Sequence, residues 1–131
     1  MARYLLDTGL VIRHLRGQRK VVRVLRGLGK EGRLSISAIT RLEVRAGMVP
    51  EERYATQKLL SRFVTCEVDS AVADRAGDLI ARKRAEGVTI AVPDAIIAAT
   101  AIQQGLSLVT LNPAHFIGLA GLSLVPWPEA D

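Results

Sequence analysis

Aromatic side chains are scarce in this sequence: Trp, Tyr and Phe together make up 4% of the 131 residues, whereas 49% of the residues are hydrophobic. A buried core must therefore be built mainly from Ala, Val, Leu and Ile, a composition that suits helices packed on a sheet. The chain is long enough to bury such a core without disulfides. We expect a single domain that covers residues 1–131.

Cysteine and long hydrophobic runs are also nearly absent. The single cysteine, Cys66, excludes an internal disulfide, and its strand-like surroundings predict a packed thiol. The uncharged stretch 95–114 is interrupted by Gln-Gln-Gly at 103–105, whereas a membrane span needs about 20 predominantly apolar residues. No secretory signal pattern follows the short apolar start at 4–6. We expect a soluble, cytoplasmic protein that does not enter a membrane.

Short strand-like runs alternate with stretches of helical spacing along the chain. Strands are predicted at Arg3–Asp7, Leu34–Ser37, Phe63–Val68, Leu106–Thr110 and Leu122–Val125. Helices are predicted at about 10–15, 21–28, 38–46, 51–62, 70–86 and 93–102. This alternation indicates an α/β three-layer sandwich, with a central, mostly parallel sheet of four to five strands flanked by helices.

Three acids, Asp7, Glu43 and Asp94, fall where a predicted strand gives way to a helix. Because the ligand crevice of an open parallel sheet lies beyond the carboxyl ends of its strands, we expect the three side chains to meet there. Two carboxylates about 4 Å apart repel each other by roughly 4 kcal/mol at an effective dielectric constant near 20. Protonation or a hard cation would relieve this repulsion, and oxygen-only ligands favour Mg²⁺ or Mn²⁺ over Zn²⁺.

Each acid also has an ordinary structural explanation. Asp7 or Thr8 could cap the first helix, and Asp94, beside a proline, could cap its own helix. A neighbouring arginine could neutralise Glu43, but residues one or two apart on a helix do not share a face, so Arg41 and Arg45 are poor candidates.

Four blocks of the sequence, in order, resemble the signature blocks of PIN-domain ribonucleases, and more specifically those of VapC-type toxins of toxin-antitoxin pairs. The blocks are Leu5-Leu6-Asp7-Thr8, residues 37–43 (SAITRLE), residues 93–101 (PDAIIAATA) and residues 108–116 (LVTLNPAHF). The resemblance implies a parallel sheet flanked by helices, a divalent-metal site, and endonucleolytic cleavage of RNA by a metal-activated water. It also implies restraint by a cognate antitoxin protein.

Carried over by position, Asp7 and Asp94 match the principal metal ligands, and Glu43 matches a third acid that binds metal directly or through water. The small hydroxyl positions that support those acids are matched by Thr8, Ser37 and Thr110. The chain departs from the family pattern at Gly9, where Asn or Ser is frequent, and at Asn112 and His115, where many members carry a fourth acid. Without the fourth acid, the presence of a second metal ion stays open, and Asn112 can act only as a neutral or water-mediated ligand. The alternative function is a catalytically silent RNA-binding PIN module.

Two other functional hypotheses compete with metal-dependent hydrolysis. In the first, His14 and His115 act as an acid/base pair on the ribose 2′-hydroxyl without metal. In the second, the chain is a phospho-accepting receiver domain, which would need paired acids after the first strand and a late lysine. Asp7 stands alone, however, and no lysine follows Lys83.

The positive charge is concentrated in one part of the chain. Residues 13–33 contain eight basic residues and one acid, a charge of +7 within a total of +5, so the remainder carries −2. Such a face suits a phosphate backbone, and a solvated surface or an acidic partner are the alternatives. The candidate RNA-binding residues are Arg13, Arg16, Arg19, Lys20, Arg23 and Arg26. A smaller cluster, Arg82-Lys83-Arg84, is expected to face solvent.

An apolar stripe runs through the same region: Leu10, Val11, Ile12, Leu15, Val21, Val22 and Leu25. We expect it to pack in the core. The alternative, which the family resemblance implies, is a groove that receives a hydrophobic segment of an antitoxin, and a homodimer surface could use part of the same region.

Overall fold

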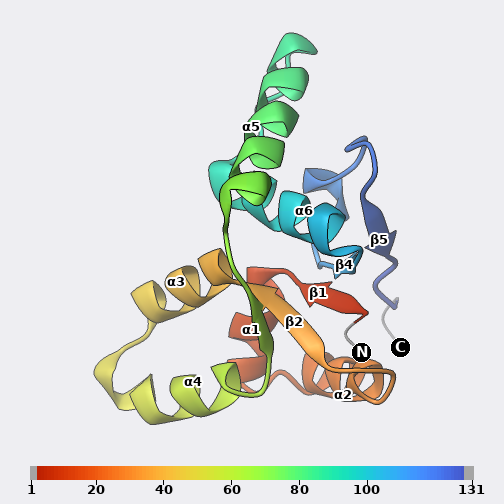
Figure 1. Cartoon of the computed structure of the whole chain (residues 1–131). Coiled ribbons are helices and arrows are strands. Elements are labelled where there is room, and N and C mark those ends of the chain that lie inside the picture. The colour runs from red at the N-terminus through yellow and green to blue at the C-terminus, as the bar shows by residue number, and fades with distance from the viewer. Residues whose placement is uncertain (1–2, 129–131) are drawn as a thin grey trace.

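The computed structural model describes residues 3–128 and contains one five-stranded sheet in which all neighbouring strands are parallel, in the order β3-β2-β1-β4-β5 (Figure 1). The strands are β1 (Tyr4–Leu6), β2 (Leu34–Ser37), β3 (Val64–Cys66), β4 (Ser107–Val109) and β5 (Ser123–Val125). All five lie within the predicted strands. The predicted mostly parallel sheet is therefore confirmed.

Helices connect the strands, as the alternating pattern predicts. They are α1 (Thr8–Leu15), α2 (Arg19–Gly29), α3 (Ala38–Gly47), α4 (Arg53–Leu60), α5 (Ser70–Ala85) and α6 (Val92–Gln104). Two single-turn helices, η1 (Pro50–Glu52) and η2 (Pro113–His115), complete the described elements. Among residues 3–128, no helix combines the length and the apolar character that a bilayer span requires.

The sheet is covered on both faces, which gives the three layers expected from the sequence. Successive side chains of a strand point to opposite faces, so Leu5 packs in one core with residues of α5 and α6, whereas Leu6 packs in a second core with residues of α1, α2 and α4. Figure 1 shows α5 and α6 on one side of the sheet and α1, α2 and α4 on the other. Both cores are mainly aliphatic, in agreement with the scarcity of aromatic residues.

The strand order determines where a site can form. Strands β2 and β3 lie on one side of β1, and β4 and β5 lie on the other side. The order therefore reverses between β1 and β4, and a crevice is expected beyond the carboxyl ends of these two strands. Asp7 directly follows β1, and Thr110 directly follows β4.

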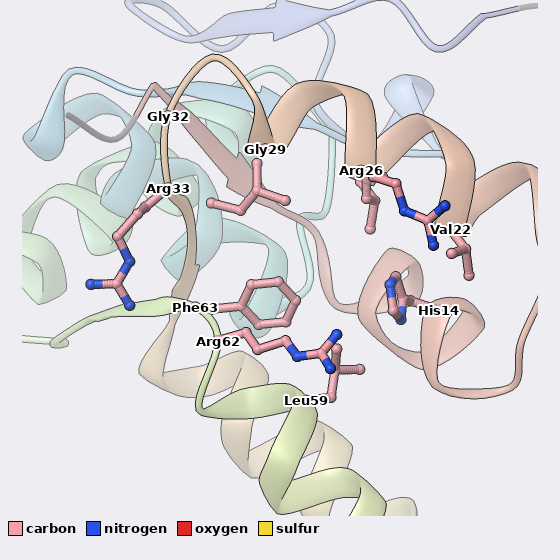
Figure 2. Close-up of a pocket in the computed structure, with 11 residues that line it drawn as sticks. His14, Val22, Arg26, Gly29, Gly32, Arg33, Leu59, Arg62 and Phe63 are labelled. Carbon is pink, nitrogen blue, oxygen red and sulfur yellow. The ribbon is translucent and has the colours of Figure 1, made fainter.

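A cavity of about 340 Å³ lies at the opposite, amino-terminal edge of the sheet, between α2 and α4 (Figure 2). We call it the α2–α4 cavity. Leu34 and Phe63, at the start of β2 and just before β3, line it together with Val22 and Leu25 of α2. The side chains of Arg26, Arg33 and Arg62 surround this apolar lining.

Candidate active site

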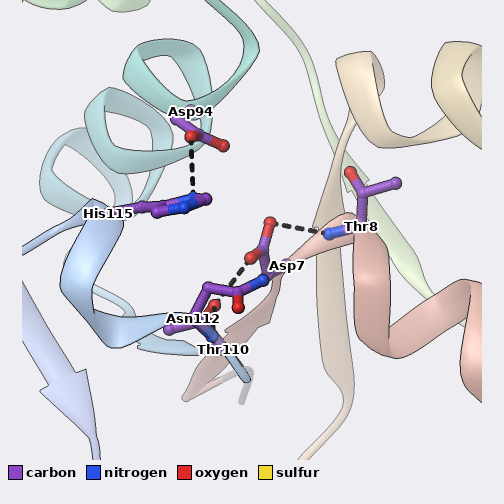
Figure 3. A network of polar contacts seen from close by, with 6 residues as sticks. All are labelled: Asp7, Thr8, Asp94, Thr110, Asn112 and His115. Carbon is purple, nitrogen blue, oxygen red and sulfur yellow. Dashed lines mark hydrogen bonds and ion pairs between the residues drawn. The ribbon is translucent and has the colours of Figure 1, made fainter. Parts of the chain in front are cut away.

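Asp7 is the most firmly held of the three acids (Figure 3). It is the N-cap of α1, where its Oδ1 accepts a hydrogen bond of 2.9 Å from the backbone N–H of Thr8. Its Oδ2 accepts a hydrogen bond of 2.6 Å from the hydroxyl of Thr110, which comes from the neighbouring strand. Asp7 is only 9% exposed and Thr110 only 1%, so the carboxylate is fixed in one orientation at the switch point of the sheet. The expected cap is confirmed.

Glu43 is linked to the same strand end through Thr8. The Thr8 hydroxyl donates a hydrogen bond of 2.7 Å to Oε1 of Glu43 and lies 2.9 Å from the hydroxyl of Thr40. Because a hydroxyl carries one hydrogen, Thr40 must donate to Thr8 while Thr8 donates to Glu43. Helix α3 thus supplies both Thr40 and, one turn later, the acid. Within residues 3–128 Glu43 forms no ion pair with a neighbouring arginine, and Arg41 donates instead to Thr65.

Asp94 lies in the first turn of α6, with its side chain 24% exposed. The interpretation of Asp94 as a helix cap is wrong, because the helix begins at Val92 and Ala91 occupies the N-cap. A proline is compatible with the first turn, and the helix therefore starts before the acid. Oδ2 of Asp94 lies 3.4 Å from Nδ1 of His115, which is brought to it by η2 (Figure 3).

The electrostatic state of Asp94 shows that the three acids influence one another. Burial, and after it the negative charge of Asp7, raise the pKa of the Asp94 carboxyl above its usual value. Glu43 raises the pKa further, while His115 acts in the opposite direction. A raised pKa of this origin is expected where like charges share one crevice. The charges of Asp7 and Glu43 thus act on Asp94, which supports the predicted convergence of the three acids.

The donor set fits a hard divalent cation in its chemistry. The three acids offer only oxygen atoms, which Mg²⁺ and Mn²⁺ prefer, and a cation would offset the repulsion felt by Asp94. As the side chains stand, no three Asp, Glu, His or Cys residues in the range 3–128 form a group close enough to hold a metal ion. The fit to a cation therefore rests on the chemistry of the donor atoms.

The remaining predicted supporting residues divide into two groups. Thr8 and Thr110 bond directly to acids, as predicted. The hydroxyl of Ser37 instead caps α3 by accepting from the backbone N–H of Ile39 at 3.1 Å. The backbone N–H of Asn112 donates to the Thr110 hydroxyl at 3.0 Å, so residue 112 supports the acid through Thr110.

Two histidines proposed as a pair lie at different places. His115 contacts Asp94, whereas His14 lines the α2–α4 cavity near Arg62. Burial, and after it the charge of Arg62, lower the pKa of His14. The hypothesis of a His14/His115 acid/base pair is therefore wrong.

The sequence did not predict the contacts of His115 with Asp94 or of Thr40 with Thr8. For Thr40 a signal existed, because it precedes Glu43 by three residues and so shares its helix face.

The basic residues lie mainly on α2 and are largely exposed, and the apolar stripe beneath them is largely core. Leu10, Val11, Val21 and Leu25 are at most 4% exposed, which confirms the core interpretation for these four. Val22 and Leu25 also line the α2–α4 cavity beside Arg26. This cavity lies at the amino ends of β2 and β3, so Arg26 is at the opposite edge of the sheet from the three acids.

Comparison with known proteins agrees with this geometry. A family model described as the PIN domain matches residues 4–121. Ribonuclease VapC10 of Mycobacterium tuberculosis is 38% identical over 112 residues, which cover 86% of this chain and 84% of the relative. A toxin-antitoxin complex from Klebsiella pneumoniae contains a similar chain, with a TM-score of 0.78 and 30% identity, covering 91% of this chain and 94% of that chain. The structure of DNA-bound VapBC from Salmonella typhimurium gives a TM-score of 0.85 with 25% identity, covering 95% and 98%.

Proposed function

This chain belongs to the PIN-domain family, and on that premise we propose that it is a VapC-type endoribonuclease, the toxin of a toxin-antitoxin pair, acting on RNA in the cytoplasm. The observation that carries the proposal is the hydrogen-bonded network that joins Asp7, Thr8 and Glu43 at the switch point of the sheet. The negative charges of Asp7 and Glu43 also act on Asp94. Acids held in this way bind a cation and place a phosphodiester beside it.

Asp7 and Asp94 are the residues that would hold Mg²⁺, or Mn²⁺ in its place, and Glu43 is a further candidate ligand. The bound cation would activate water and offset charge on the phosphoryl oxygens. Thr110 orients Asp7, because its hydroxyl donates to the carboxylate. Thr8 orients Glu43 in the same way, and we assign Glu43 to orienting or deprotonating the attacking water. Because Asn112 stands in place of a fourth acid, we propose that the site binds a single cation.

The products follow from the nucleophile. Water attack leaves a 5′-phosphate and a 3′-hydroxyl, whereas attack by the ribose 2′-hydroxyl leaves a 2′,3′-cyclic phosphate. End-group analysis of cleaved RNA by mass spectrometry therefore tests the mechanism. Cyclic phosphate ends would contradict it.

Cleavage of RNA by the purified chain, titrated with Mg²⁺, tests the function itself. We expect cleavage that requires the cation and is lost in Asp7→Asn and in Asp94→Asn. Asp69→Asn is a suitable control, because Asp69 caps α5 and its side chain bonds only to the N–H of Val72 within the described contacts. RNA binding without Asp94-dependent cleavage would favour the catalytically silent RNA-binding module.

We assign the basic residues of α1 and α2 to the phosphate backbone of an RNA that extends across this face. Support comes from their exposure and from the concentration of +7 in residues 13–33. The affinity for RNA should fall as salt rises, and replacing Arg19 and Arg23 by Gln should lower the slope of log K against log salt by roughly 0.7 per lost contact with single strands. Arg45→Gln with Arg53→Gln, outside this region, is the matched control. An unchanged slope would indicate that the face serves a protein partner.

The protein partner is a cognate antitoxin, and its docking place belongs to the same proposal. The α2–α4 cavity has an apolar lining within a ring of arginines, so it suits an antitoxin segment that carries aliphatic and acidic residues. Val22→Asp should weaken binding of the antitoxin without changing RNA cleavage by the free toxin.

We also propose that the chain forms a homodimer. Light scattering of the free chain measures its mass and tests this proposal. A monomer at high concentration would exclude the homodimer.

A further inference from the structure

A second pocket, which we call the Lys83 pocket, opens directly beside the acids. Its volume is about 310 Å³, within the range of small-ligand sites, and its lining includes Asp94, His115, Lys83, Val88 and Ile117. Because Asp94 and His115 belong to both places, a group bound in this pocket lies next to the phosphodiester at the acids.

Lys83 is held inside this pocket. Its side chain is only 13% exposed, and its ammonium lies 3.3 Å from a carboxylate oxygen of Glu86. A Cβ atom added at Gly118 would lie 2.8 Å from the same ammonium, so the chain after η2 passes closely over it. The expectation that Lys83 faces solvent is therefore wrong. Glu86 is 53% exposed and engages one of three donors, so the ammonium can still donate to a ligand.

The mouth of the pocket carries large aliphatic side chains in contact with water. Val88 is 46% exposed and Ile117 is 67% exposed. Val88 is placed there by the end of α5, where Gly87 adopts φ +81 and the N–H of Val88 returns to the carbonyl of Lys83 at 2.8 Å. An inorganic anion would contact the ammonium but would leave the apolar side chains of Val88 and Ile117 uncovered. A planar ring with polar edges can cover these side chains and also accept a hydrogen bond from the ammonium.

We propose that the Lys83 pocket binds the nucleobase of one nucleotide adjoining the scissile phosphate, and that Lys83 reads it. The base packs against Val88 and Ile117, and the Lys83 ammonium donates to an acceptor on its edge. Lysine matches the two adjacent acceptors of guanine, O6 and N7, whereas adenine presents an N6 amino donor beside its N7 acceptor. The pocket therefore disfavours adenine on one side of the cut. This inference rests on the proposed RNA cleavage by Asp7, Glu43 and Asp94.

Binding is measured first, without cleavage. The full chain, labelled at Val, Leu and Ile methyl groups and kept in excess chelator, is titrated with the dinucleotide guanylyl-guanosine, with an abasic dinucleotide and with inorganic phosphate. We expect the methyl signals of Val88 and Ile117 to shift with guanylyl-guanosine only, while that of Val49 stays in place. Unmoved Val88 and Ile117 signals, or equal shifts with phosphate, overturn the proposal. Shifts caused only by an antitoxin peptide would assign the pocket to that partner and overturn it equally.

Cleavage of a pool of RNA with randomised sequence then tests the specificity. The wild-type chain should disfavour adenine at one position beside the cut, and Lys83→Met should level this preference and raise KM at least about tenfold, with kcat less affected. Arg84→Met, an exposed cation on the same helix, should behave as wild type. Ile117→Ala, compared with Val49→Ala, gives a second variant whose exposed position spares the fold.

The two proposals fail in different ways. Cleavage that depends on Asp94 but keeps its base preference and KM in both Lys83→Met and Ile117→Ala overturns the pocket and leaves the nuclease standing. Absence of Asp94-dependent cleavage in the wild-type chain defeats the nuclease, and the methyl titration alone then decides whether the pocket binds a base.

Discussion

Replacing Thr110 by Val removes one hydroxyl and keeps the shape of the side chain. In the wild-type chain this hydroxyl donates the 2.6 Å hydrogen bond to Oδ2 of Asp7, in a place where Thr110 is 1% exposed and Asp7 is 9% exposed. Water cannot replace the lost donor there, so the Asp7 carboxylate is left with one hydrogen-bond partner fewer. The hydroxyl also accepts from the N–H of Asn112, an exposed residue for which water can substitute.

The magnitude follows from these contacts. A hydrogen bond to a charged group contributes about 1.5–3 kcal/mol, and the loss at Asn112 adds little because that residue is solvated. Thr110→Val should therefore reduce the free energy of unfolding by about 2 kcal/mol, which corresponds to a fall in Tm of roughly 6–10 °C for a chain of this size. RNA cleavage should fall by about 10- to 100-fold, as is usual when the partner of a metal-binding carboxylate is removed.

Urea unfolding followed by circular dichroism and initial rates of RNA cleavage at saturating Mg²⁺ measure the two effects. Thr110→Ser keeps the hydroxyl and is the control, so it should retain most of the activity. Wild-type stability and cleavage in Thr110→Val would show that the bond does not hold Asp7, and would refute the argument for a rigid first ligand.

Three further outcomes are expected. Asp94→Asn should abolish cleavage yet stabilise the chain at pH 7. Burial and the charge of Asp7 raise the pKa of the folded Asp94 carboxyl, so its favourable contribution exists at low pH and is lost as pH rises through that pKa. The stabilisation should therefore shrink in thermal melts as pH falls below the carboxyl range, and a gain independent of pH would contradict it. Thr8→Val should lower cleavage by about 10-fold at unchanged antitoxin affinity, because Glu43 loses its 2.7 Å donor, and equal losses in both assays would point to general damage. Cys66, whose thiol pKa is raised by burial, should react with iodoacetamide only on unfolding, as mass spectrometry of native and urea-treated chain can show.

The positions of Asp7 and Glu43 were predictable because each follows a strand, β1 or β2, and parallel strands bring their carboxyl ends to one edge. The expectation that Asp94 also marks the end of a strand is wrong, because helix α5 and not a strand precedes α6. Asp7 and Glu43 also reach the site through short-range devices that a sequence displays, namely a helix cap and a residue one turn into a helix. The pattern of strands and helices followed from the same local rules. These features depend on neighbours in the chain.

The features that escaped prediction depend on distant segments. His115 reaches Asp94 through η2, a single turn whose direction is set by how Phe116 packs into the core. Lys83 looks solvent-facing among Arg82 and Arg84, and becomes covered only because a later segment crosses it at Gly118. The start of α6 lies at Val92, one residue before the predicted start at 93, because a proline is tolerated within the first turn.

The bond between Thr110 and Asp7 joins residues 103 positions apart in the chain. Asp7 emerges from the ribosome almost at once, but the hydroxyl that orients it emerges near the end of synthesis, directly after strand β4, which must insert beside β1. A chain that stops before residue 110 therefore lacks the donor that orients Asp7. Shortening the chain at its carboxyl end should thus disturb a residue that lies near its amino terminus.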